Sequence, residues 1–96
     1  MEGYMLTVTD KAIDFLMNLM QRMEAQKKVR ITLDDAAGAN ALGLVLDEAA
    51  GDGDAVFAIH GITFLMDQDL YEKAEPIDID FIEYTPGAGF KITSGL

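Results

Sequence analysis

The stretch Ile77-Asp-Ile-Asp-Phe-Ile-Glu-Tyr84, continued by Thr85-Pro-Gly-Ala-Gly-Phe-Lys-Ile92, decides the fold of this chain. Apolar and polar residues alternate in the first segment, which is typical of a strand with one buried and one hydrated face. The alternation predicts that Ile77, Ile79 and Phe81 point inward, while Asp78 and Asp80 lie on the hydrated face. A Pro-Gly corner and a second short apolar run follow. We therefore predict two strands of one sheet in this part of the chain.

One segment near the N-terminus has helical periodicity instead. Ile13, Leu16 and Met20 belong to an apolar arc with the three- and four-residue spacing of an amphipathic helix. Thr9 has the chemistry of an N-cap, and Asp10 follows in the first turn, near the positive end of the helix dipole. We predict a helix over residues 10–26 that packs its apolar face on a mostly β body.

Methionine is frequent in and near this helix, at Met17, Met20, Met23 and Met5. Methionine-rich faces serve as adaptable docking surfaces in some proteins, and as flexible core fillers in others. Because these methionines share the single apolar arc of the helix, we favour the core interpretation.

The rest of the chain alternates with period two or carries turn residues. Val29, Ile31 and Leu33 are expected to face inward from one strand, with Lys28, Arg30 and Thr32 on its hydrated face. His60-Gly61 is expected to join two strands in a tight hairpin. Strands are predicted at residues 5–8, 29–33, 42–46, 55–60, 62–66, 77–84 and 90–93, with a short helical turn at 67–74. We predict a mainly β (α+β) fold, a compact sandwich of short mixed strands with one N-terminal helix, in a single domain over residues 1–96.

The charge balance restricts the partners. Seventeen acidic residues against seven basic ones give a formal net charge of -10. Such a surface repels phosphate backbones and anionic lipid headgroups, so we expect no nucleic-acid or membrane partner. It favours basic proteins or cations, although acidic residues also serve solubility. The N-terminal residues lack a signal-peptide pattern, and no apolar run reaches a membrane span, so a cytoplasmic protein is expected.

The residues for catalysis are few. His60 is the single histidine, and Ser94 is one candidate nucleophile near the end of the sequence. A nucleophilic site needs a base that is oriented by a carboxylate and lies beside the nucleophile, so we expect no catalytic residues and no enzyme activity. The segment 87–89 has two glycines but lacks the third of a nucleotide-binding fingerprint, and it precedes a strand.

Three acidic pairs raise the possibility of calcium. None has the ligand spacing of a calcium loop, so we interpret them as hydrated surface and predict neither a metal ligand nor a cofactor there. The pairs are Asp52/Asp54, Asp67/Asp69 and Asp78/Asp80.

The ordered set of segments resembles the HesB/IscA-like A-type iron–sulfur carrier family. The most specific part is Ile79-Asp-Phe-Ile-Glu83 followed by Gly87-Ala-Gly-Phe-Lys-Ile92, and the resemblance extends over nearly the whole chain. It implies a compact β sandwich with an N-terminal helix, in proteins that assemble as dimers or tetramers and hold or pass on a cluster or iron.

The family's chemistry depends on three cysteines, and this sequence has none. The resemblance places the first ligand position at or near Ala37, and the other two in a Cys-x-Cys tail beyond Leu96. Thiolates select iron–sulfur clusters, so the chain is expected to be a degenerate member that holds none. Asp34 and Asp35 beside the loop are the remaining oxygen ligands.

Three functions stay open at this point. The first is a non-catalytic accessory or protein-interaction module related to iron–sulfur cluster assembly or sulfur metabolism, with a protein partner and no cofactor. The second is a carrier of iron or another metal that uses Asp34, Asp35 and His60, or ligands from a partner chain. The third, a small-molecule or enzymatic role, has no supporting residues. We also expect a weak homodimer with residues 36–41 or 90–93 near its interface.

Overall fold

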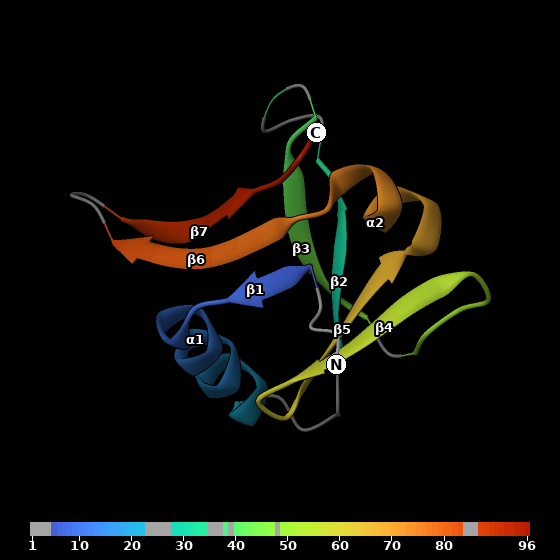
Figure 1. The fold of residues 1–96 in the computed structure, drawn as a ribbon. Helices are drawn as coiled ribbons and strands as arrows, with labels where there is room; N and C mark the ends of the chain where they lie inside the picture. The colour runs from blue at the N-terminus through green and yellow to red at the C-terminus, as the bar shows by residue number, and fades with distance from the viewer. Residues whose placement is uncertain (1–4, 23–27, 35–37, 39, 48, 84–86) are drawn as a thin grey trace.

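The computed structural model describes residues 5–22, 28–34, 38, 40–47, 49–83 and 87–96. Seven strands and two helices follow one another in these residues (Figure 1). In chain order they are β1 (Leu6–Val8), α1 (Asp10–Gln21), β2 (Lys28–Leu33), β3 (Leu42–Asp47), β4 (Asp54–Ile59), β5 (Ile62–Asp67), α2 (Gln68–Ala74), β6 (Ile77–Glu83) and β7 (Ala88–Thr93).

The strands form two mixed sheets. One sheet has the order β1-β6-β7, with β1 parallel and β7 antiparallel to β6. The other has the order β3-β2-β5-β4, in which only β2 and β5 are parallel. The predicted pair at the end of the sequence is confirmed, since Phe81 of β6 lies opposite Phe90 of β7. The mainly β fold with short mixed strands and an N-terminal helix is therefore confirmed.

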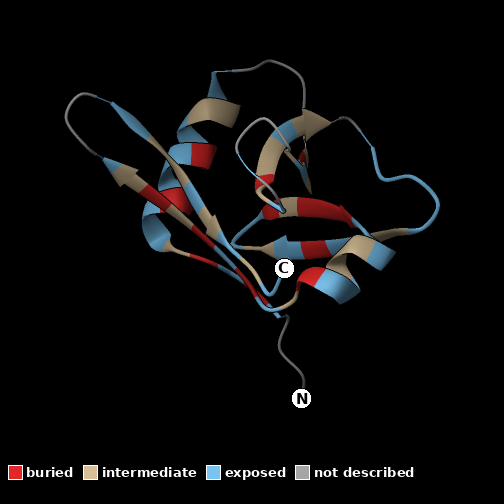
Figure 2. Ribbon diagram, turned by 90° about the horizontal axis from the view of Figure 1, so that it is seen from above, coloured by how far each residue is buried: buried red, intermediate tan, exposed pale blue. Residues whose placement is uncertain are grey.

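The core lies where the two sheets and the helices meet (Figure 2). Strand β6 alternates as predicted, with Ile77, Ile79 and Phe81 buried and Asp78 exposed. Helix α1 packs against β6, and α2 packs against β4 and β5. The hydrophobic effect on these facing apolar surfaces holds the layers together.

Helix α1 begins as its sequence predicts. Thr9 is the N-cap, and its Oγ1 accepts a hydrogen bond from the Ala12 N–H at 3.3 Å. The same hydroxyl donates to Asp80 Oδ1 at 2.8 Å, which ties the start of the helix to β6. This hydrogen bond and that from the Phe81 N–H lower the pKa of Asp80, because both stabilise its charged form.

The helix is shorter than predicted. It ends at Gln21, where the N–H of Arg22 donates to Leu19 O at 3.2 Å and closes a tighter final turn. The helix was predicted to continue to residue 26, and this is wrong at Arg22, which caps the helix instead of extending it. Residues 23–27, which include Met23, lie outside the described residues.

The core interpretation of the methionines is wrong for two of them. Met17 is 41% exposed and Met5 is 48% exposed, whereas Met20 packs partly buried against the core. The fully enclosed face of α1 comprises only Ala12, Ile13 and Leu16, because the helix packs on one side against β6 and leaves the rim of its apolar arc in solvent.

The alternation of β2 also fails at its last residue. Val29 and Ile31 are buried, but Leu33 is 48% exposed, because it lies at the end of the strand beyond the packed interior. The predicted hairpin between β4 and β5 is confirmed. Gly61 lies in its turn with φ 84°, a conformation that favours glycine. None of the helices in the described residues is long and apolar enough to cross a membrane.

Candidate functional site

A cleft of about 490 Å³ opens at the carboxyl ends of β2 and β5, beside α2. Parallel pairing brings these two strand ends to the same edge of the sheet. Apolar side chains line the cleft together with charged ones, among them Lys73, Asp67 and Asp69. The lining residues include Ile31, Leu33, Asn40, Leu70 and Leu96.

Local hydrogen bonds fix the walls of this cleft. Asp67 is the N-cap of α2, and its Oδ2 accepts from the Leu70 N–H at 3.1 Å. Beyond β7, the Gly95 N–H donates to Ala74 O at 2.6 Å, which places Leu96 beside the end of α2. A Cβ on Gly95 would lie 2.7 Å from Glu75 O, so only glycine allows this approach.

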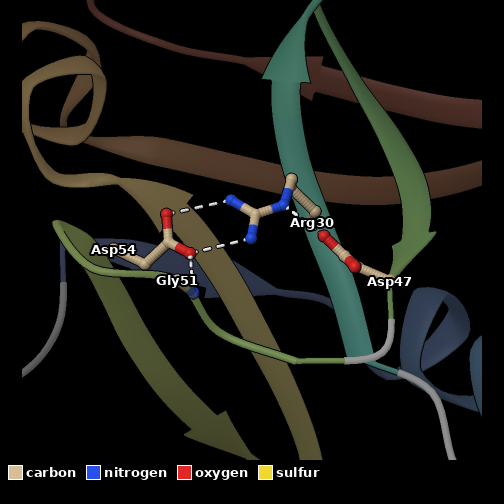
Figure 3. Close-up of polar contacts among 4 residues, drawn as sticks. All are labelled: Arg30, Asp47, Gly51 and Asp54. Atoms are coloured by element: carbon tan, nitrogen blue, oxygen red, sulfur yellow. Dashed lines mark hydrogen bonds and ion pairs between the residues drawn. The ribbon is translucent and has the colours of Figure 1, made fainter.

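Arg30 is one of the residues that line the cleft, and its side chain joins three strands (Figure 3). Its Nη1 and Nη2 donate to both carboxylate oxygens of Asp54 at 2.9 and 2.7 Å, and its Nε donates to Asp47 Oδ2 at 2.7 Å. The Gly51 N–H adds a further hydrogen bond to Asp54 Oδ2 at 2.7 Å. These bonds lower the pKa of Asp54 to about 2, the Arg30 hydrogen bond being the main cause, and raise that of Arg30.

The arginine also covers part of the outer sheet face. Because β5 lies between β2 and β4, the guanidinium must cross β5 to reach Asp54. Leu65 of β5 lies beside Arg30 in the pairing register and is fully buried, although it is not part of the central core. Arg30 therefore combines an ion pair with shielding of an apolar side chain.

The candidate metal residues of the sequence are spread apart. Asp34 follows β2, where its N–H donates to Ala41 O at 2.8 Å and its side chain packs near Gly43. His60 is exposed in the β4–β5 turn with φ 51°. Because β2 and β5 are parallel, with Ile31 opposite Met66, the two residues lie at opposite ends of the sheet. Asp34 is level with a position seven residues beyond Ile62, which follows the turn, or about 23 Å along the strands at about 3.3 Å per residue.

One copy of the chain therefore does not bring Asp34 and His60 to a common ion. Asp35 lies outside the described residues. So does Ala37, at or near which the resemblance places a cysteine ligand. Asn40 of the same loop lines the cleft. Among the residues that the structure describes, no three His, Cys, Asp or Glu side chains gather in a group that could hold a metal ion.

The acidic pairs have structural partners instead of calcium geometry. Asp54 binds Arg30, Asp67 caps α2, and Asp80 accepts from Thr9. Ser94 Oγ accepts a hydrogen bond from the Leu96 N–H at 3.2 Å. In each acidic pair, at least one aspartate therefore accepts a hydrogen bond from another part of the chain.

Neither the cleft nor the Arg30 network follows from the local sequence pattern. Arg30 was expected only as part of the hydrated face of β2, and its two carboxylate partners lie 17 and 24 residues away in the chain. A basic residue inside an alternating strand, followed by Asp at the ends of later strands, is the one signal that could have indicated it. The cleft has no such signal, because Leu33, Lys73 and Leu96 meet only in the folded chain.

Several solved protein structures have a fold similar to that of this chain. No family model matches the sequence, and no curated protein matches it either. SufA of Escherichia coli, involved in biosynthesis of iron–sulfur clusters, has a similar structure with a TM-score of 0.73 and 20% identity, over 93% of this chain and 84% of SufA. IscA with a [2Fe-2S] cluster gives 0.72 and 18%, over 93% and 84%. A solution structure of a protein from Aquifex aeolicus gives 0.70 and 23%, over 96% and 93%. The chain thus has, without a single cysteine, the fold of the iron–sulfur proteins SufA and IscA.

Proposed function

We propose that this chain is a non-catalytic, HesB/IscA-like protein-interaction module that acts beside iron–sulfur cluster assembly and holds no cluster itself. The observation that carries the proposal is the match to the fold of SufA and IscA, over 93% of this chain, in a sequence without thiols. Thiolates are the ligands that iron–sulfur clusters require, and carboxylates are no substitute for them. A chain that has this fold but no thiolates can still bind other proteins through its surface.

The cleft beside α2 supplies the contact surface in this proposal. Leu33 is 48% exposed and Leu96 is 41% exposed, and both line it. Exposed apolar side chains that meet at a concave site are typical of protein contacts. With a net charge of -10, the chain favours a partner segment that combines apolar side chains with lysine or arginine.

Site-specific photo-crosslinking tests whether the cleft binds a protein partner. A photo-crosslinking amino acid is placed at Leu33 or, as a matched control, at Val56, which is 52% exposed on β4 and does not line the cleft. We expect one partner to be captured from Leu33 and not from Val56, and its purified complex to weaken as salt rises. Leu33→Glu should abolish the complex, whereas Val56→Glu should leave it intact.

Capture that is equal from both positions, or affinity that increases with salt, would contradict the proposed contact.

A second measurement tests whether the chain binds an iron–sulfur cluster. After anaerobic reconstitution with iron and sulfide, the purified chain should stay colourless, with IscA treated in parallel as the positive control. A stoichiometric iron–sulfur chromophore on this chain would overturn the cluster-free assignment.

A further inference from the structure

The tip of the β4–β5 hairpin lies beside the end of α1 (Figure 1), and a second hollow is lined by residues of both elements. It is a groove of about 240 Å³, lined by Met17, Met20 and Gln21 of the helix and by Gly61 and Ile62 of the hairpin. Ile62 is buried in the core and forms part of the floor, whereas Met17 and Gly61 are exposed at the rim. The groove therefore brings two thioethers to one accessible place.

The helix fixes the spacing of these thioethers. Residues three apart lie on the same face of a helix, with Cβ atoms about 5–6 Å apart. Met17 and Met20 have this spacing, and both contact the same groove. Three rotatable bonds in each side chain allow the two sulfur atoms to converge on one point. Burial does not explain Met17, which remains 41% exposed on the rim of the helix.

The single histidine, His60, does not line the groove, but it is the chain neighbour of Gly61, which does. His60 directly precedes Gly61, and the two residues form the turn between the paired positions Ile59 and Ile62. Both turn residues have positive φ, 51° and 84°, so a two-residue turn of fixed geometry presents His60 at the tip. The imidazole is exposed to solvent and available as a ligand.

We propose that Met17 and Met20 bind Cu(I) in this groove and that His60, from the adjoining turn, supplies a third ligand. Thioethers are soft ligands that select Cu(I), and imidazole also suits copper. The net charge of -10 attracts the cation to the surface. Binding is coordination alone: Cu(I) keeps its oxidation state, and no bond of the protein is broken. Hard ions such as Mg²⁺ and Ca²⁺ prefer oxygen ligands and bind thioethers poorly.

Competition with a chromophoric Cu(I) chelator tests the site. Under anaerobic, reducing conditions Cu(I) is titrated into the protein in the presence of bicinchoninate, and we expect one ion per chain. Met17→Leu and Met20→Leu should each weaken binding by about tenfold or more, and the double variant should abolish it. Leucine conserves the side-chain volume of methionine, so these variants should fold normally.

Two further variants make the test specific. Met5→Leu removes a thioether that is 48% exposed but lies outside the groove, and it should leave Cu(I) affinity unchanged. His60→Asn retains a residue that tolerates positive φ, and it should weaken Cu(I) binding without loss of the hairpin. X-ray absorption of the copper-loaded chain should show both sulfur and nitrogen neighbours.

Several results would overturn the proposal. They are unchanged affinity in the double methionine variant, an equal loss in Met5→Leu, and a copper shell without sulfur. Unchanged affinity in His60→Asn would remove His60 from the site. None of these outcomes bears on the protein partner at the cleft, because the crosslinking positions Leu33 and Val56 do not line the groove.

Discussion

Replacement of Leu16 by alanine is the sharpest test of how the helix is held. Leu16 lies in the middle of α1 and is only 2% exposed. The substitution removes three buried carbon atoms at about 0.8 kcal/mol each, or about 2.4 kcal/mol of transfer free energy. Leu16 also lines a hollow of about 70 Å³ between α1 and the sheets, so its neighbours already leave space unfilled.

That hollow determines the second part of the estimate. If the neighbours leave about 50 Å³ of new space empty, the cavity adds roughly 1.2 kcal/mol at about 24 cal/mol per Å³. The expected loss in the free energy of unfolding for Leu16→Ala is therefore about 3–4 kcal/mol. Domains of this size have a total stability of about 5–15 kcal/mol, so the loss should lower Tm by more than about 10 °C.

Urea denaturation of both proteins measures this difference. The midpoint should fall while the slope with denaturant stays constant, since the same surface is exposed on unfolding. Met17→Ala is the matched control, because Met17 is the next residue of the same helix but is 41% exposed, and we expect it to cost under about 1 kcal/mol. Equal losses for the two variants would refute the packing of α1 through its Leu16 face.

The remaining predictions concern caps, charges and association. Thr9→Ala should cost about 1–2 kcal/mol in denaturation experiments, whereas Thr9→Ser should keep the cap and cost little. Asp54 has its pKa lowered from 3.8 to about 2, so its ion pair stabilises the fold above about pH 4 and this stabilisation is lost as the pH falls towards 2. Asp54→Asn should flatten that part of the stability profile, and an unchanged acid transition would contradict the assignment. Gly95→Ala should destabilise the fold, because its Cβ would clash with Glu75 O, and wild-type stability would argue against this close approach. A homodimer through the edge strand β7 should be weak and should tighten as salt screens two charges of -10, and a strict monomer in sedimentation at low and moderate salt would exclude it.

The methionine-bearing helix illustrates why a correct periodicity gives an incomplete core. The apolar arc of α1 includes Met17, but the enclosed strip is narrower and is centred on Leu16. Phe15 lies on the other rim, and it stacks on Phe81 with 4.2 Å between ring centroids while remaining 40% exposed. A helix that packs on one strand of a small sandwich has two half-covered rims. Its residue pattern does not indicate which rim faces a ring and which faces a groove.

The amino-acid sequence by itself determined the elements and their order. Period-two alternation identified β6 and its buried isoleucines, the chemistry of Thr9 marked the start of α1, and Gly61 marked the hairpin. These features depend on contacts between residues close in the chain, or on one face of one element, and local physics is sufficient for them. The lack of thiols is likewise a property of composition alone.

Only the tertiary structure decided which distant residues meet. Arg30 reaches Asp54 across β5 because of the strand order β3-β2-β5-β4, and no local pattern specifies that order. The parallel register of β2 and β5 separates Asp34 from His60. Strand order and register are set by the balance of burial over the whole chain, a sum of many small terms, so the arrangement of both candidate sites becomes visible only once all the elements are packed together.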